Sequence, residues 1–254
     1  MIIPNNKVEF KGDKNIARTQ ETNLGNLITD AMEDYAAKNF KHKPDFAVTN
    51  GGGIRASISK GKVTQNDIIT VLPFGNLISQ IKVKGTNVKK AFEHSLGSNA
   101  FFTFAFEHSL GSPTETKDGK KQLSPNGGFL QVSKSIRVYY DMNQKSGSRV
   151  RDIQVRNRET GKFEKLNPNK TYYVATNDFT ANKGDGYDMF GGQREEGISL
   201  DEVVGNYIQK HNLNEYNTNN PERIINGKLD SVKKSTHKSD NGKQSSNHTH
   251  KKSA

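Results

Sequence analysis

The stretch PDFAVTNGGGIR, residues 44–55, joins a short apolar run to three glycines and an arginine. The apolar residues before Asn50 predict a short buried strand, because β-branched and aromatic residues favour extended, covered segments. Gly51 to Gly53 have no Cβ atom, so the backbone there can come close to another group. Arg55 carries a planar guanidinium that suits a phosphate or a carboxylate. Two interpretations are open at this point: a flexible turn, or a backbone that approaches a ligand.

The composition predicts one folded domain with a tail. The chain has 254 residues, 31% of them apolar, and a mean hydropathy of −0.85, which indicates a modest core and some disordered sequence. The absence of cysteine excludes disulfides and thiolate metal sites. No run of about 18 apolar residues predicts a membrane span. The first ten residues, MIIPNNKVEF, lack a basic segment followed by a long apolar one, so we expect no signal peptide there. We also expect no sorting signal at the C-terminus.

The net charge is 38 − 27 = +11, which favours anionic partners. From Leu229 onward the tail holds six lysines and two aspartates, a surplus of +4. The remaining +7 is spread over the chain without an arginine-rich helix or a recognition helix. We therefore do not expect nucleic-acid binding.

Hydrophobic spacing and turn residues predict strands and helices in an irregular order. The predicted strands cover residues 6–12, 44–50, 77–85, 129–140, 149–157 and 171–177. The predicted helices cover 22–39 with a cap at Thr22 or Asn23, a capped turn in 63–72 that breaks at Pro73, 86–96, and 199–211 with a capping box of Ser199 and Glu202. Residues 112–128 and 177–192 are predicted loops. This order indicates an α+β fold, a single mixed α/β layered domain over residues 6–228, followed by a disordered tail at 229–254.

The octapeptide AFEHSLGS occurs twice, at 91–98 and at 105–112. The offset of 14 residues is close to four helical turns of about 3.6 residues each, so an inserted copy would nearly keep the face of a helix. The Gly-Ser pair in each copy favours a break instead. We interpret the repeat as a local duplication without a functional role.

The chemistry-bearing residues exclude several enzyme classes. None of the seven histidines lies in an Asp-x-His or Gly-Asn-His setting, as a metallohydrolase would require. The sequence also shows no Ser–His–Asp arrangement and no phosphate-binding GxxxxGK[ST] loop. We therefore expect no catalytic residue, no metal site and no cofactor in this chain.

Two loops carry residues suited to a nucleoside monophosphate. Phe74 lies in LPFGN, between a proline and a glycine, and Phe179 lies in NDFTANKGDGYDMF, which contains two glycines. Aromatic side chains in such loops stack on planar bases, although a place in the core is the alternative for Phe74. Asn182 offers an amide in the second loop, and the Asp185 carboxylate can accept hydrogen bonds from paired ribose hydroxyls. With Arg55, these side chains favour a nucleoside monophosphate as ligand.

Six segments resemble, in order and in spacing over nearly all of residues 6–228, the C-terminal substrate-binding domain of the 5′-nucleotidase family. They are RTQETNLGNLITDAM, DFAVTNGGGIR, VLPFGN, KGTNVKKAFEHSL, GGFLQVS and NDFTANKGDGYDMF. Within that family the closest likeness is to the surface adenosine synthases of Gram-positive cocci. In the family, an N-terminal calcineurin-like domain holds two divalent metal ions and performs the hydrolysis. The C-terminal domain clamps the nucleoside and swings about a hinge.

The resemblance also implies ligands, partners and site residues. The ligands would be AMP, adenosine and other nucleoside monophosphates. The protein would be extracellular or at the cell surface. The metallophosphatase domain would be a partner in cis or in trans. Phe74 and Phe179 would enclose the base, with Asn50 at its edge. Arg18 and Arg55 would line the ribose–phosphate side and Asp185 would bind the ribose hydroxyls. The glycines, with Gly52 and Gly53 in the site, would let the backbone pass the nucleoside; Asn182 completes the predicted set.

The sequence departs from the family pattern in three ways. The metallophosphatase motifs are missing, which indicates a truncated gene product or an excised fragment. The repeat is unusual, and we expect its first copy to keep the helix position while the insert bulges outward. Lys183 stands where the family often has glycine and would point to solvent or add a cation near the ligand. Two other interpretations stay open: an adhesion module whose basic tail binds anionic polymers or a host ligand, and a remnant that no longer folds.

Overall fold

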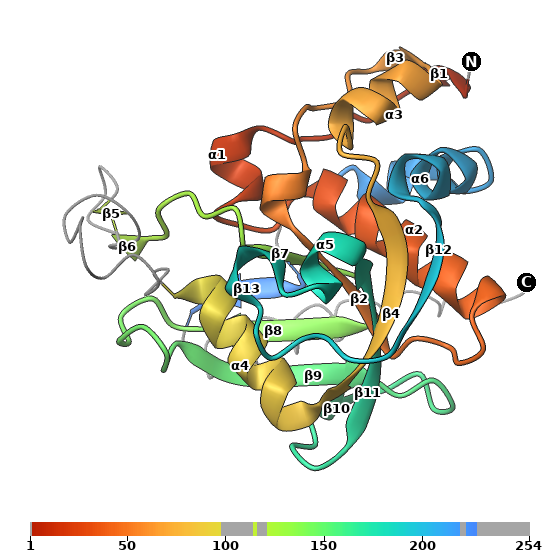
Figure 1. Cartoon of the computed structure of the whole chain (residues 1–254). Coiled ribbons are helices and arrows are strands. Elements are labelled where there is room, and N and C mark those ends of the chain that lie inside the picture. Colours follow the sequence, from red (N-terminus) through yellow and green to blue (C-terminus); the bar gives the residue numbers. More distant parts are fainter. Residues whose placement is uncertain (1, 98–113, 116–120, 219–221, 228–254) are drawn as a thin grey trace, which may run out of the picture.

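A five-stranded mixed sheet runs through the fold (Figure 1). The hydrophobic core forms two clusters, one on each face of this sheet. The structure is a computed structural model that describes residues 2–97, 114–115, 121–218 and 222–227. The strand order is β12-β4-β11-β2-β7. These strands are β2 (Phe46–Asn50), β4 (Leu77–Lys84), β7 (Leu130–Val132), β11 (Thr171–Asn177) and β12 (Arg194–Ser199). β2 and β11 are parallel, whereas the other neighbouring pairs are antiparallel.

The two central strands are apolar on both faces because each face is covered. Along β2, Phe46 and Val48 belong to one cluster and Ala47 belongs to the other. Along β11, Val174 and Ala175 alternate in the same way. Successive side chains of a strand point to opposite faces, so these residues place the sheet between two layers. The mixed α/β layered fold predicted from the sequence is confirmed.

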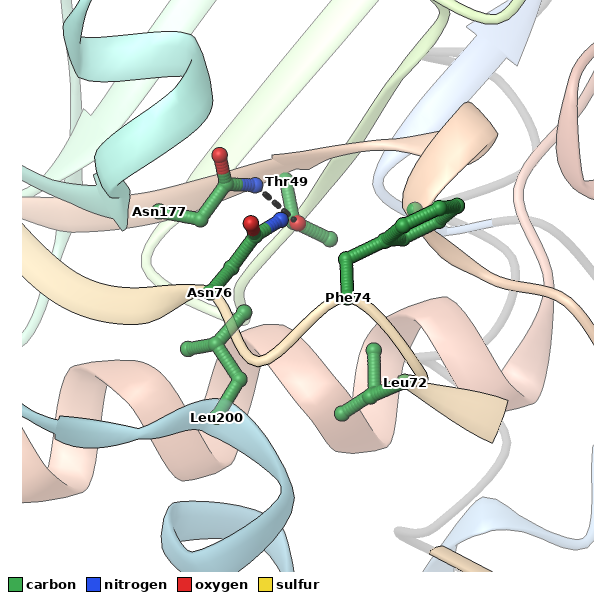
Figure 2. Close-up of a pocket in the computed structure, with 7 residues that line it drawn as sticks. Thr49, Leu72, Phe74, Asn76, Asn177 and Leu200 are labelled. Carbon is green, nitrogen blue, oxygen red and sulfur yellow. Dashed lines mark hydrogen bonds between the residues drawn. The ribbon is translucent and has the colours of Figure 1, made fainter. Parts of the chain in front are cut away.

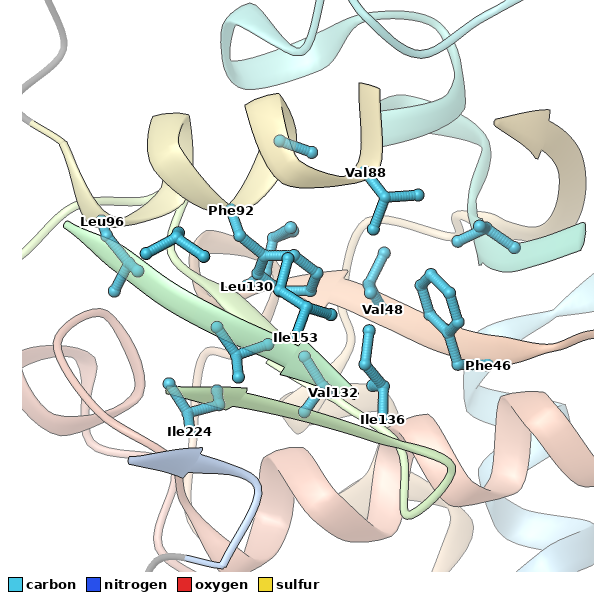
Figure 3. Packing of buried hydrophobic residues seen from close by; sticks show 14 of the residues in the cluster. Phe46, Val48, Val88, Phe92, Leu96, Leu130, Val132, Ile136, Ile153 and Ile224 are labelled. Atoms are coloured by element: carbon cyan, nitrogen blue, oxygen red, sulfur yellow. The ribbon is translucent and has the colours of Figure 1, made fainter. Parts of the chain in front are cut away.

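The first cluster packs helix α4 (Gly85–Leu96) against a second sheet of order β10-β9-β8-β13. Its strands are β8 (Ile136–Tyr140), β9 (Val150–Arg156), β10 (Phe163–Lys165) and β13 (Ile224–Asn226). Figure 3 shows Val88, Phe92 and Leu96 of α4 pointing into this cluster. The first AFEHSLGS copy therefore supplies the end of α4, as predicted. The second copy lies outside the described residues.

The second cluster packs α2 (Asn23–Asn39) and α6 (Leu200–Ile208) on the opposite face of the central sheet. The cap of α2 is Thr22, whose hydroxyl accepts a hydrogen bond from the Gly25 amide at 2.9 Å. The helix α3 (Gln65–Val71) begins with a capping box of Thr64 and Asp67. The remaining helices are α1 (Lys14–Ala17) and α5 (Asp178–Ala181), with 3-10 turns at 51–53, 184–186 and 213–216. None of the helices in the described ranges is long and apolar enough to cross a membrane.

The strand predicted at residues 6–12 is wrong. The strand there is β1 (Ile3–Asn6), which pairs with β3 (Gly61–Val63). It ends because the Asn6 amide hydrogen-bonds the Val8 backbone, accepting from the amide at 3.0 Å and donating to the carbonyl at 2.6 Å. Such local side-chain bonds compete with the strand ladder. Phe10 then forms only an isolated bridge with Ile58.

The predicted strand 129–140 is two strands in different sheets, β7 and β8, joined by residues 133–135. Polar groups on α2 hold this connection: the Lys134 amide donates to the Asp30 carboxylate at 2.8 Å, and the Ser135 hydroxyl donates to Glu33. These bonds are long-range, so the period-2 pattern of the sequence does not reveal the break.

Other elements also differ from the sequence predictions. Ser199 precedes α6 and is also the last residue of β12, but its side chain makes no capping hydrogen bond. The loop predicted at 112–128 contains a two-stranded ladder of β5 (Thr114–Glu115) and β6 (Lys121–Gln122). The strands β10, β12 and β13 had no clear apolar alternation and were not predicted.

A buried ion pair ties β13 to α2. Arg223 donates to both oxygens of Asp30, at 2.8 and 3.0 Å, and the Tyr216 hydroxyl donates to the same carboxylate at 2.9 Å. The side chain of Asp30 is 2% exposed and that of Arg223 is 15% exposed. Removing one member of a buried pair leaves the other charge without compensation.

We expect Arg223→Met to lower the free energy of unfolding by about 3–5 kcal/mol, because the Asp30 carboxylate stays buried and loses its cation. Urea denaturation measures the change. Lys38→Met is the control, since Lys38 pairs with Asp34 on the exposed surface of the same helix and such pairs contribute about 0.3–0.5 kcal/mol. Equal effects of the two substitutions would contradict the role given to Arg223.

We expect Glu33→Gln to stabilise the protein at neutral pH. Burial raises the pKa of Glu33 above its ordinary value of 4.5, against an opposing hydrogen bond from Ser135. The folded state therefore prefers the protonated acid, and this stabilisation is complete below pH 4.5 and is lost as the pH rises through the raised pKa. The variant, which mimics the protonated form, should exceed the wild type in unfolding free energy at pH 7 and match it near pH 4. A less stable variant at pH 7 would refute this assignment.

Candidate functional site

The carboxyl ends of the parallel strands β2 and β11 lie side by side and define the site. The pairing of Phe46 with Val174 and of Ala47 with Ala175 brings Asn50 and Asn177 to the same edge. The Asn177 amide donates to the Thr49 hydroxyl and to the Asn50 side-chain oxygen, both at 3.0 Å; Figure 2 shows the bond to Thr49. In open α/β sheets, ligands bind outside the carboxyl ends of the strands.

The first loop at this edge is the 3-10 turn Gly51–Gly53. A Cβ atom on Gly51 would lie 2.2 Å from the Ala17 carbonyl oxygen, and one on Gly52 would lie 3.0 Å from the Gly127 carbonyl oxygen. The Gly51 and Gly52 amides also donate to the carbonyls of Phe129 and Gly127, both at 2.7 Å. The close approach of the chain's own backbone therefore requires glycine at position 51 and favours it at position 52, whereas no backbone atom approaches Gly53 in this way.

The second loop begins with α5 and continues through a tight turn. The Asn177 side chain caps α5 by accepting from the Thr180 amide at 2.8 Å. After the helix, Lys183 and Asp185 adopt positive φ angles of 68° and 54°. The Asp185 carboxylate accepts from the Asn50 amide at 2.8 Å. The side chain of Asn50 thus connects the two loops, with its oxygen accepting from Asn177.

The two loops line a cleft of about 480 Å³ together with three other segments: the end of α1, the residues before β4 and the residues before β7. It is lined by Arg18, Asn50, Gly52, Gly53, Arg55, Phe74, Asn76, Gly127, Phe179 and Asp185. The structure therefore brings together all of the predicted site residues except Asn182. The side-chain oxygen of Asn182 accepts instead from the Arg194 guanidinium, and Asn182 is exposed. Lys183 is exposed as well.

The two phenylalanines line the cleft with much of their surface exposed. Phe74 is 58% exposed and Phe179 is 43% exposed, so Phe74 is not a core residue. The Phe74 ring lies 5.6 Å from the Arg55 guanidinium carbon, a cation–π distance. The Phe179 ring packs on Gly184, where a Cβ atom would lie 2.6 Å from two ring carbons. Each ring therefore contacts the protein, through Arg55 or through Gly184, and keeps apolar surface exposed to the cleft.

The charges in the cleft favour an anionic ligand with hydroxyl groups. Arg18 and Arg55 are the cations among the lining residues, and Asp185 is the carboxylate. The Nε atom of Arg18 is buried and has no hydrogen-bond partner among the described residues. A guanidinium with unused donors suits a phosphate, and the remaining lone pairs of Asp185 can accept from hydroxyls.

Sequence reasoning missed Asn76 and Gly127, which also line the cleft. Asn76 follows the PFG segment that carries Phe74, and Figure 2 shows its amide beside Thr49 and Asn177. Gly127 lies in the Asn-Gly-Gly segment of residues 126–128, and its backbone contacts Gly52 of the first glycine run. The Asn-Gly-Gly pattern occurs at residues 50–52 and again at 126–128, and this repetition could have indicated that Gly127 belongs to the site.

Within the part of the chain that the structure describes, no group of three or more histidines, aspartates and glutamates is placed to hold a metal ion.

Burial raises the pKa of Tyr187, which directly follows the tight turn of the second loop, well above its ordinary value of 10.0. Tyr187 is fully buried, and its hydroxyl donates to the Gly128 carbonyl.

Comparison with known proteins gives consistent matches. Residues 5–192 match the family described as 5′-nucleotidase, C-terminal domain. The chain is 34% identical over 183 residues to the trifunctional nucleotide phosphoesterase protein YfkN of Bacillus subtilis (strain 168), covering 72% of this chain and 11% of that protein. It is 34% identical over 219 residues to the snake venom 5′-nucleotidase of Macrovipera lebetinus, covering 80% of this chain and 47% of that enzyme.

A solved 5′-nucleotidase structure has a similar fold. The crystal structure of a 5′-nucleotidase precursor from Thermus thermophilus superposes with a TM-score of 0.67 at 31% identity, covering 88% of this chain and 39% of that one. The chain therefore spans less than half of the length of each of these relatives.

We expect Gly51→Ala to destabilise the protein by about 1–3 kcal/mol, because the new methyl group would overlap the Ala17 carbonyl and push the backbone away. Gly53→Ala is the matched control, since its Cβ atom would meet only the Asn50 side chain, at 3.3 Å. Thermal and urea unfolding compare the two variants. Equal stabilities would show that the close backbone approach at Gly51 does not limit the fold.

Proposed function

Since the chain belongs to the 5′-nucleotidase C-terminal domain family, we propose that it binds nucleosides and nucleoside 5′-monophosphates in the cleft between Phe74 and Phe179. The observation that carries this proposal is that two half-exposed phenyl rings, two guanidinium groups and one carboxylate line a single cleft. This combination suits the three parts of a nucleotide: an aromatic base, a sugar with paired hydroxyls and an anionic phosphate.

Each part of the ligand has a proposed partner in the cleft. Phe74 and Phe179 stack on the base, and stacking contributes about 1–3 kcal/mol per base with little discrimination among bases. Asp185 accepts hydrogen bonds from the ribose hydroxyls. Arg18 and Arg55 face the phosphate side. Asn50 lies at the floor of the cleft, where its amide fixes Asp185 and its remaining surface meets the base edge.

The proposed reaction is that of a 5′-nucleotidase, in which a nucleoside 5′-monophosphate and water give a nucleoside and phosphate. A bound metal pair would supply the activated water, and we place that pair in a metallophosphatase domain that acts in cis within a longer protein or in trans. The role of this chain is to bind and orient the nucleotide. The names of the relatives, a nucleotide phosphoesterase and a venom 5′-nucleotidase, support this assignment.

The proposal extends to product and location. Adenosine would be the product with AMP as substrate, and the site of action would be extracellular or at the cell surface, as in a secreted venom enzyme. The closer likeness to the adenosine synthases of Gram-positive cocci stays a prediction.

We expect the intact 254-residue chain to bind adenosine and AMP, and Phe74→Ala and Phe179→Ala each to weaken binding about 5- to 150-fold, since each removes one stacking face. Isothermal titration calorimetry measures the affinities. Phe163→Ala is the control, because Phe163 also lies under a guanidinium, that of Arg137 at 4.0 Å, but does not line the cleft. Absence of adenosine binding to the wild type would overturn the proposed function.

We expect the chain alone not to hydrolyse AMP in the presence of Mn²⁺, Zn²⁺ or Mg²⁺. Release of inorganic phosphate from AMP measures this, with a chelator added in a parallel sample. Metal-dependent turnover that the chelator abolishes would show that this chain has its own hydrolytic centre and would contradict the binding role.

A further inference from the structure

The turn that carries Asp185 adopts an unfavourable backbone conformation. Lys183, Asp185 and Gly186 have φ angles of 68°, 54° and 79°. A left-handed conformation costs a non-glycine residue about 1–2 kcal/mol, so two such residues within three positions require support from the surrounding structure.

The same turn fixes the positions of two side chains that line the cleft, those of Phe179 and Asp185. Gly184 lies directly under the Phe179 ring, whose Cε1 and Cζ atoms would be 2.6 Å from a Cβ at that position. One residue later, Asp185 places its carboxylate 2.8 Å from the Asn50 amide. A shift of this turn would therefore move the ring and the carboxylate together.

His94 supports the turn from behind. Its Nε2 atom lies 2.7 Å from the Asp185 carbonyl oxygen, and because a carbonyl only accepts, Nε2 is the donor. Its ring meets the Tyr187 ring edge-on, with 4.8 Å between centroids. A Cβ atom on Gly186 would lie 3.1 Å from the His94 ring. His94 does not line the cleft.

The helix that carries His94 is held firmly by its neighbours. The Glu93 carboxylate accepts from the amides of Arg149 and Val150, at 2.8 and 3.0 Å. The Ser95 hydroxyl accepts from the Leu130 amide at 2.8 Å. His94 therefore projects from a fixed part of the fold onto the turn that carries Asp185.

We propose that His94 is a positioning residue that holds Asp185 in place for the vicinal hydroxyls of ribose, and so sets the preference for ribonucleosides over 2′-deoxyribonucleosides. This inference rests on the proposed nucleoside binding. Without the hydrogen bond from His94, the left-handed backbone at Asp185 loses its donor from α4, and only the Asn50 amide then holds the carboxylate among the contacts described above.

The test compares His94→Phe with His94→Gln in the intact chain. Phenylalanine keeps an aromatic ring against Tyr187 but cannot donate, whereas the glutamine amide can donate at a similar reach. The measured quantity is the ratio of the dissociation constants of 2′-deoxyadenosine and adenosine. We expect His94→Phe to reduce this ratio about 3- to 10-fold and His94→Gln to keep it within about 2-fold of the wild type. An unchanged ratio in His94→Phe would overturn the inference.

The repeat offers a matched control. His108 occupies the same position in the second AFEHSLGS copy, and we expect His108→Phe to leave the ratio unchanged, because α4 contains the first copy. A loss of discrimination in His108→Phe but not in His94→Phe would contradict the assignment of the role to His94. If His94→Phe does not fold, His94→Met gives the same comparison with glutamine, since methionine has a similar length and no donor.

A ligand-free measurement separates failure of this inference from failure of the proposed function. Amide hydrogen exchange of Gly186 and Tyr187 reports the support of the turn directly, and we expect faster exchange in His94→Phe than in the wild type and in His94→Gln. If amide exchange is faster in His94→Phe but the wild type does not bind adenosine, His94 still supports the turn, and both the ribose preference and the proposed function are overturned. Equal exchange with intact binding would overturn the inference alone.

Discussion

The parallel pairing of β2 with β11 is the constraint on which the site depends. Parallel strands end at the same edge of a sheet, so the two glycine-containing loops that follow Asn50 and Asn177 begin next to each other although they are far apart in the sequence. The Asn177 amide then joins the ends of both strands through Thr49 and Asn50. Another register of this pair would separate Phe179 and Asp185 from Arg55. Phe74 precedes β4, whose antiparallel pairing with β11 places Ile78 opposite Asn177.

The sheet can hold this register because both of its faces are buried. Phe46 and Val48 face α4 and the second sheet, while Ala47 faces α2. A slip of one residue would exchange the two sets of side chains and would place phenylalanine where the fold has room for alanine. The ion pair of Asp30 and Arg223 adds a polar anchor on the α2 side, where Asp30 also holds the connection between β7 and β8.

Backbone contacts and side-chain contacts have different roles in the cleft. The close approach at Gly51 leaves no space for a Cβ atom, and a Cβ atom at Gly52 would be tight; these approaches bring Ala17, Arg18 and Gly127 against the first loop. Side-chain hydrogen bonds from Asn50 and His94 hold the second loop, where Asp185 adopts a left-handed conformation. The first loop is thus fixed by backbone packing and by the hydrogen bonds of the Gly51 and Gly52 amides, whereas the second also depends on side-chain donors.

The sequence by itself determined the helices at 23–39 and 85–96, the strands around 46–50, 77–84 and 171–177, the layered α+β class and most of the cleft, because apolar periodicity, caps and glycine runs are local signals. Residue chemistry alone singled out Arg55, Phe74, Phe179 and Asp185, and the motifs that resemble the 5′-nucleotidase family added Arg18 and Asn50. Only the tertiary structure decided where β7 ends, that Asn182 turns to Arg194, that Asn76 and Gly127 join the cleft, and that His94 supports Asp185. Each of these depends on a hydrogen bond or a close approach between segments distant in the sequence, and such contacts leave no periodic pattern in the residues themselves.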